Sequence, residues 1–112
     1  MVALCYNINM NQNEKRVPHY KLALIQKLIN DKKYIITKTA IDNAGNDFGL
    51  KVKEIIKYVL TLDNSCFYKS MTSIYDHKIW QDVYHLKINK IFAYIKLLIV
   101  DNKSVIIQFK RK

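Results

Sequence analysis

The residues best suited to chemistry lie between Phe67 and Tyr84, in the stretch FYKSMTSIYDHKIWQDVY. The stretch contains two short strand-like runs in which polar and aromatic side chains are mixed. The polar members are Lys69, Ser70, His77, Gln81 and Asp82, and they lie among Tyr68, Tyr75, Trp80 and Tyr84. Ammonium groups pair with phosphates, and aromatic rings stack on bases. The stretch therefore predicts part of a surface that binds a polyanion with flat bases.

The composition of the whole chain agrees with such a surface but does not require it. The 112 residues contain 19 Lys plus Arg and 9 Asp plus Glu, which gives a net charge of +10, and half of them are hydrophobic. This length and hydrophobic content predict one folded domain. The charge points to nucleic acid, an acidic membrane surface or an acidic protein as the partner. Codon bias toward lysine also explains part of the charge.

Several other classes of protein are disfavoured. Two cysteines, Cys5 and Cys66, do not make a disulfide framework, and no stretch resembles a secretory signal peptide. Apolar runs such as Leu97 to Val100 are far shorter than the roughly 20 residues that a membrane span requires. The histidines and cysteines show no metal-ligand spacing. We therefore expect a cytoplasmic protein with no membrane contact, no metal and no cofactor.

The elements that position these residues can be read from the hydrophobic pattern. Residues 1–13 show no helical or strand periodicity and are expected to form a poorly ordered tail, with Met10 as an alternative start. Residues 14–112 are expected to form the single domain. Its first half predicts three helices: one from Pro18 to about Asn30, one capped by Thr37 and ended by Gly45, and one with apolar residues from Val52 to Val59.

The second half predicts strands at about 67–73, 79–86, 91–100 and 104–110, with a short extended piece at 34–36. Helices followed by a run of strands predict an α+β fold, in which the N-terminal helices pack on one face of a C-terminal antiparallel sheet.

The last two strands allow a prediction of register. In the first of them the odd positions, from Ile91 to Ile99, are all apolar and are expected to face the helices. In the second, Val105, Ile107 and Phe109 are expected to face the same way, which leaves Ile106, Gln108 and Lys110 outward. A three-residue turn at 101–103 would pair Val100 with Ser104 and therefore Tyr94 with Lys110. Tyr94, Lys96, Gln108 and Lys110 would then form one polar cluster on the open face of the sheet.

Such a cluster contains the groups that cleave RNA without metal. This reaction needs a base for the 2′-hydroxyl proton, an acid for the leaving oxygen and cations for the charged phosphorane. A lysine among other cations has a lowered pKa and can exchange protons near neutrality. Spacing alone, however, favours the plainer interpretation that Lys96 and Lys110 are solvated surface lysines and that Tyr94 is a half-buried strand residue.

Several segments together resemble a known family. These are EKRVPH at 14–19, FYKSMT at 67–72, DHKIWQDVY at 76–84, the pair Tyr94 and Lys96, and the final Phe109–Lys110. The region 14–112 resembles the MqsR family, the motility quorum-sensing regulator toxins of bacterial type II toxin–antitoxin pairs. The resemblance implies a RelE-like ribonuclease fold and a metal-independent endoribonuclease that cleaves single-stranded mRNA.

The resemblance also implies roles for particular residues. The family's functional positions fall on Lys69, Gln81, Tyr94 and Lys110. Tyr94 is expected to act in proton transfer, Lys69 and Lys110 to stabilise phosphate charge or share that transfer, and Gln81 to orient the scissile nucleotide. RNA-binding roles are expected for Lys96, Tyr68, Tyr84 and Gln108.

Two other functions remain open on the sequence. The chain could be a non-catalytic nucleic-acid-binding module, or a regulatory protein that acts only by binding an antitoxin. The toxin interpretation implies mRNA as substrate and a cognate antitoxin as partner, the latter meeting a strand edge or the basic face. Dependence on the ribosome is not indicated either way.

Overall fold

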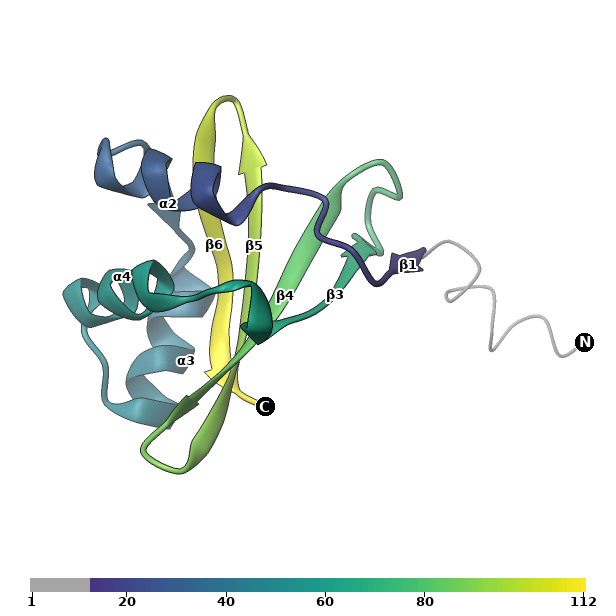
Figure 1. The fold of residues 1–112 in the computed structure, drawn as a ribbon. Coiled ribbons are helices and arrows are strands. Elements are labelled where there is room, and N and C mark those ends of the chain that lie inside the picture. Colours follow the sequence, from purple (N-terminus) through teal and green to yellow (C-terminus); the bar gives the residue numbers. More distant parts are fainter. Residues whose placement is uncertain (1–12) are drawn as a thin grey trace, which may run out of the picture.

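The computed structural model describes residues 13–112, in which a six-stranded sheet carries helices on one face (Figure 1). The strands, in the order β1-β3-β4-β5-β6-β2 across the sheet, are β1 (Glu14–Lys15), β3 (Phe67–Thr72), β4 (Trp80–Ile88), β5 (Ile91–Val100), β6 (Lys103–Arg111) and β2 (Tyr34–Ile36). The helices are α2 (Leu22–Asn30), α3 (Lys38–Phe48) and α4 (Val52–Thr61), followed by the 3₁₀ turn η1 (Asn64–Cys66). The predicted α+β class is confirmed.

The sheet is mostly antiparallel. β2 is the exception, because it pairs parallel with β6 at one edge. At the other edge, β1 pairs antiparallel with β3. Asn13, placed in the expected tail, exchanges hydrogen bonds with Thr72: its N–H donates to Thr72 Oγ1 at 2.8 Å, and its carbonyl accepts from the Thr72 N–H at 2.9 Å. The expectations about residues 1–12, including the alternative start at Met10, lie outside the described residues.

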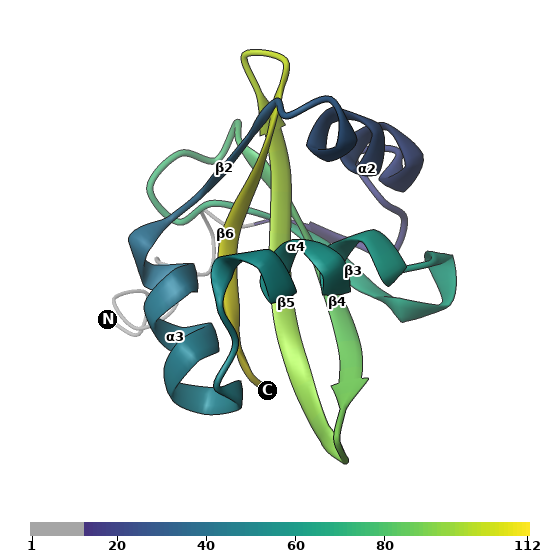
Figure 2. The same cartoon turned by 90° about the vertical axis from the view of Figure 1, so that its left-hand side faces the viewer.

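The core lies between the helices and one face of the sheet. Figure 2 shows α2, α3 and α4 in front of the strands, so within residues 13–112 no helix packs on the opposite face. Ala93, Ile95 and Leu97 of β5 are fully buried against Ile25 of α2 and other helical side chains, which confirms the predicted inward set. We call the helix-free side of β3, β4, β5 and β6 the open face.

The boundaries of α3 were predicted only in part. Thr37 is its N-cap as expected, since its Oγ1 accepts a hydrogen bond from the Ala40 N–H at 3.1 Å. The helix does not end at Gly45 but continues to Phe48, and Gly49 caps it with φ of 68°. Gly45 retains helical conformation, and the left-handed residue that favours glycine lies four positions later.

The β5–β6 hairpin contains the predicted Tyr94–Lys110 pair, but its turn and its register differ from those predicted. Asp101 and Asn102, both with positive φ, form a two-residue turn that pairs Val100 with Lys103, so the expected three-residue turn is wrong. A bulge beside Lys96 and Leu97 then shifts the register by one residue and restores Tyr94 opposite Lys110.

The same bulge reverses the expected faces of β6 near the turn. Ile106 is fully buried in the core, although it was expected to point outward. Ile107, expected in the core, instead lines a hollow on the open face. A single extra residue in one strand inverts the alternation of side chains, and the hydrophobic pattern of β6 does not reveal it.

Candidate active site

Four neighbouring strands each bring one of the predicted catalytic side chains to the open face. β3 carries Lys69, β4 carries Gln81, β5 carries Tyr94 and β6 carries Lys110. Lys110 lies directly opposite Tyr94, and Gln81 lies opposite Met71, two residues beyond Lys69 on β3. Residues more than 40 positions apart in sequence therefore share one surface, because antiparallel neighbours present paired residues on the same side.

A bulge in β3 places two consecutive residues on this surface. The register of β3 with β4 shifts between Phe67 and Lys69. Phe67 packs edge-on against Tyr84 at 5.6 Å between ring centroids, whereas Tyr68 stacks on His85 of β4 at 4.3 Å with an interplanar angle of 22°. The bulge thus lets Tyr68 and Lys69 both serve the open face.

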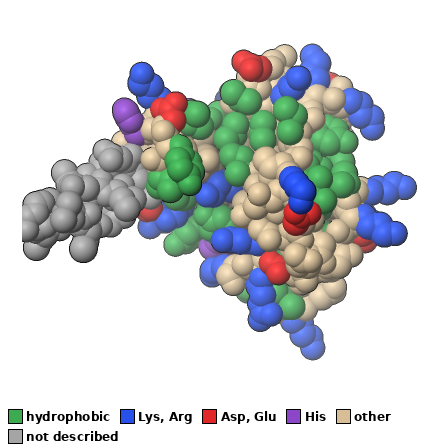
Figure 3. All heavy atoms as spheres, turned by 180° about the vertical axis from the view of Figure 1, so that it is seen from behind, with side chains coloured by type: hydrophobic (Ala, Val, Ile, Leu, Met, Phe, Trp, Pro, Cys, Tyr) green, Lys and Arg blue, Asp and Glu red, His purple; other side chains and the backbone are tan. Residues whose placement is uncertain are grey.

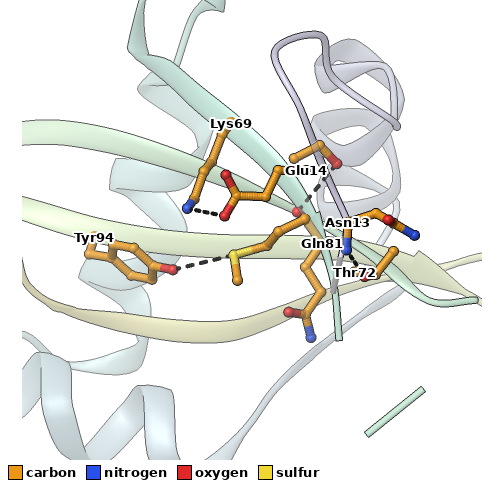
Figure 4. Close-up of polar contacts among 8 residues, drawn as sticks. Asn13, Glu14, Lys69, Thr72, Gln81 and Tyr94 are labelled. Atoms are coloured by element: carbon orange, nitrogen blue, oxygen red, sulfur yellow. Dashed lines mark hydrogen bonds and ion pairs between the residues drawn. The ribbon is translucent and has the colours of Figure 1, made fainter. Parts of the chain in front are cut away.

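Tyr94 lies at the centre of the cluster. Its hydroxyl donates to Met71 Sδ at 3.9 Å, as Figure 4 shows, and this weak acceptor can readily be exchanged for a substrate oxygen. The ammonium groups of Lys110 and Lys96 lie 5.3 and 5.7 Å from the ring centroid. Burial, and then the nearby Tyr68 and Glu14, raise the pKa of Tyr94. The hydroxyl therefore stays protonated at neutral pH and acts as a donor.

The pKa values of the nitrogen bases in the cluster, Lys96 and His85, are lowered. Burial, followed by Lys110 and Lys69, lowers the pKa of the half-buried Lys96. Burial and Lys112 lower the pKa of His85, whose ring lies 6.0 Å from that of Tyr94. Since the ordinary histidine pKa is about 6.5, His85 is uncharged at neutral pH. His85 was not predicted as a site residue, because only the β4–β5 register places it opposite Tyr94.

Lys69 has a carboxylate partner that the sequence did not single out. Its Nζ lies 2.7 Å from Glu14 Oε2, with side-chain exposures of 18% and 44% (Figure 4). Glu14 arrives through β1, whose two residues pair with Met71 and Ser70 of β3. A two-residue strand has no periodicity by which a sequence could reveal it.

A buried carboxylate fixes the segment between β1 and α2. Asp82 is fully buried and accepts hydrogen bonds from the His19 and Tyr20 N–H groups at 3.1 and 2.9 Å. His19 then stacks on Trp80 at 5.4 Å, and Lys15 Nζ lies 4.2 Å from the Trp80 ring. Asp82 therefore has a structural role that helps hold β1 beside the open face.

The structure disfavours RNA binding by two of the residues for which it was expected, Tyr84 and Gln108. Tyr84 is fully buried in the core, where burial raises its pKa to about 12, so the expectation that it stacks on a base is wrong. Gln108 lies opposite Lys96, but its Oε1 accepts hydrogen bonds from Asn43 Nδ2 of α3 at 2.8 Å and from the Phe109 N–H at 3.1 Å. The oxygen of this amide is occupied within the protein, which disfavours its expected contact with RNA.

The open face is hollowed beside Gln81 and Lys96. This hollow of about 420 Å³ is also lined by Met71 and Ile107. A larger hollow of about 720 Å³ lies at the start of α2, between residues 18–26 and 62–64, and its lining includes none of the four predicted catalytic residues. We place the site on the open face beside the smaller hollow, because Gln81 and Lys96 line this hollow and Lys96 lies two residues along β5 from Tyr94.

Net charge alone does not locate this site. Figure 3 shows lysine and arginine side chains projecting on several sides of the molecule, with few acidic groups among them. What distinguishes the open face is the combination of cations with aromatic rings. Among residues 13–112, no cluster of three or more His, Cys, Asp or Glu side chains could hold a metal, and no helix is long and apolar enough to cross a membrane.

The fold and the site define a class: a small α+β protein whose helix-free sheet face carries lysines, a tyrosine, a histidine and a glutamine suited to acid–base chemistry on RNA. The model of a protein family described as the motility quorum-sensing regulator, toxin of MqsA, matches residues 17–111. The chain belongs to this family, and its architecture agrees with the RelE-like fold that the resemblance implied. It is 37% identical over 99 residues to the mRNA interferase toxin MqsR of Escherichia coli (strain K12), over 88% of this chain and 99% of that relative.

Proposed function

We propose that this chain is the toxin of a type II toxin–antitoxin pair and that it cleaves single-stranded mRNA without a metal ion. The observation that supports this most is the convergence of Lys69, Gln81, Tyr94 and Lys110 from four strands onto one open face. Membership of a toxin family, and the mRNA interferase activity named for the relative from E. coli, support the same function.

The proposed reaction is attack by a ribose 2′-hydroxyl on the adjacent phosphorus. His85 takes the 2′-hydroxyl proton, since it is uncharged at neutral pH and lies beside Tyr94. As the new P–O2′ bond forms, the P–O5′ bond breaks, and the Tyr94 hydroxyl gives its proton to O5′. The products are a 2′,3′-cyclic phosphate and a 5′-hydroxyl end, and a proton passes from His85 back to Tyr94.

The cations and the amide support this step without exchanging protons. Lys69 and Lys110 stabilise the charge that builds up on the phosphorane oxygens. Gln81, at the hollow beside Lys96, orients the scissile nucleotide. Lys96 adds positive charge to this hollow, and Tyr68, stacked on His85, offers a ring to a neighbouring base.

We also propose a cognate protein antitoxin as partner, because the family description names the toxin together with MqsA. An acidic surface would complement the open face, and the outer edge of β1 or β2 could pair with a strand of the partner.

The function is tested by expression in a bacterial host lacking the antitoxin. We expect the wild-type chain to arrest growth and to deplete mRNA, and Tyr94→Phe or Lys69→Ala to do neither. Tyr58→Phe and Lys57→Ala on α4 are matched controls, since they make the same chemical changes on the helical side and should remain toxic. Arrest by all variants alike, with intact mRNA, would support a non-catalytic nucleic-acid-binding module instead. No arrest by the wild-type chain would support a protein that acts only by binding an antitoxin.

A further inference from the structure

A second row of side chains lies next to the row that contains Tyr94. In the catalytic row, His85, Tyr94 and Lys110 lie side by side on β4, β5 and β6. In the flanking row, defined as Lys87, Phe92 and Lys112, Lys87 pairs with Phe92, and the Lys112 N–H donates to the Phe92 carbonyl at 2.8 Å. The two rows are two residues apart along each strand, a separation of about 7 Å.

The flanking row resembles the surroundings of Tyr94. At both positions an aromatic ring on β5 has two ammonium groups over it, from Lys110 of the catalytic row and Lys96 at Tyr94, and from the two lysines of the flanking row at Phe92. The distances to the ring centroid are 5.3 and 5.7 Å at Tyr94, and 5.7 Å from Lys112 and 6.0 Å from Lys87 at Phe92. The flanking row has no counterpart to the hydroxyl of Tyr94 or the imidazole of His85, so it can bind but has no groups for acid–base chemistry.

Phe92 has no evident structural reason to be aromatic. Its exposed fraction is 46%, and it is not among the residues that form or pack against the core. A single exposed hydrophobic residue is ordinary. Here, however, the ring lies in line with the candidate active site and between two cations, which is the arrangement that favours a base together with its phosphate.

We propose that Phe92, with Lys87 and Lys112, is a nucleotide subsite that stacks the base of a nucleotide flanking the scissile one. The proposal rests on the proposed function and deepens it. It makes the substrate an extended single strand that runs along β5 from Tyr94 toward the start of that strand. Binding at this subsite lowers KM for RNA long enough to reach it and leaves the chemical step unchanged.

The test compares a short RNA centred on the cleavage site with RNAs extended by three nucleotides on the 5′ or the 3′ side. For the wild-type protein we expect an extension on one of the two sides to lower KM by about tenfold. Phe92→Ala should abolish this gain while kcat on the short RNA stays the same, and Phe92→Trp should retain it. Val100→Ala is the matched control, because Val100 is also on β5 and has an exposed fraction of 47%.

Failure of the subsite and failure of the proposed function give different results. If the wild-type protein cleaves RNA but Phe92→Ala keeps the full gain from extension, the subsite is wrong and the nuclease stands. If the wild-type protein cleaves nothing, the nuclease is wrong. The dissociation constant of a long single-stranded RNA then decides the subsite: a tenfold rise in Phe92→Ala supports it, and an unchanged value overturns it.

Discussion

The roles that we propose for Tyr94 and His85 agree with how the open face shifts their pKa values. The raised pKa of Tyr94 keeps its hydroxyl protonated, as the proposed acid requires, whereas the lowered pKa of His85 keeps this ring uncharged, as the proposed base requires. Two groups with pKa values pushed apart make an acid–base pair that works at neutral pH. In the same proposal Lys96 and Lys110, whose ammonium groups lie over the Tyr94 ring, supply positive charge to the phosphate that would react there.

His85 should therefore control the acid side of the pH–rate profile. The pKa of His85 is lowered from the ordinary value of about 6.5. We therefore expect kcat/KM to be constant at neutral pH and to fall as the pH decreases through this lowered pKa, because the ring then becomes charged. In His85→Gln, kcat should fall by roughly 10²- to 10⁴-fold, and the decrease of kcat/KM at low pH (the acid limb of the profile) should disappear. His77 lies in an exposed loop, so His77→Ala should retain the wild-type kcat and the acid limb. An unaltered acid limb in His85→Gln would assign the base to another group.

Glu14 is expected to weaken RNA binding through its contact with Lys69. Its carboxylate forms an ion pair with the Lys69 ammonium, with 2.7 Å between Oε2 and Nζ. The negative charge of this carboxylate also repels an incoming phosphate. Glu14→Gln should lower the dissociation constant for RNA a few-fold and change the free energy of unfolding by about 1 kcal/mol or less, because the pair is partly exposed. Glu54→Gln makes the same change of charge on α4 and should leave RNA binding nearly unchanged. Equal effects of the two variants would contradict this role.

At the scale of elements, much of the arrangement could be predicted and some could not. Apolar alternation in β5 and the cap at Thr37 follow directly from residue type and spacing. The bulges in the β3–β4 and β5–β6 pairs were not predicted, because one extra residue in a strand does not change the composition of that strand detectably. The Tyr94–Lys110 pair was nevertheless obtained, since a shorter turn and a bulge compensate each other. Glu14 and His85 escaped because only strand pairing brings them to the site.

Asp82 couples two elements, and its loss should affect both stability and the site. It is buried and accepts two N–H groups from the segment that joins β1 to α2. Asp82→Ala leaves these donors unpaired and should lower the free energy of unfolding by about 1–3 kcal/mol in denaturant titrations. Asp31→Ala removes only an exposed ion pair with Lys27 and should have a much smaller effect. Equal losses in the two variants would contradict the structural role of Asp82.

At the scale of the molecule, the two faces of the sheet have separate tasks. The helical side buries the core, and on the open side the described residues 13–112 present cations and rings with no helix over them (Figures 1 and 2). This division explains why Tyr84 and Tyr94 differ so strongly although both lie in strands: one faces the helices and the other faces solvent. Sequence alternation placed Tyr94 on the open face, but only the assembled sheet shows that Tyr84 faces the core.

The central claim is cleavage of RNA by protein side chains alone. The most direct test incubates the purified chain with a defined single-stranded RNA at neutral pH in excess EDTA and determines both new ends. We expect cleavage that leaves a 2′,3′-cyclic phosphate and a 5′-hydroxyl, and a loss of at least about 100-fold in Tyr94→Phe. RNA left intact by the wild-type protein in EDTA, or cleaved equally by Tyr94→Phe, would contradict the account.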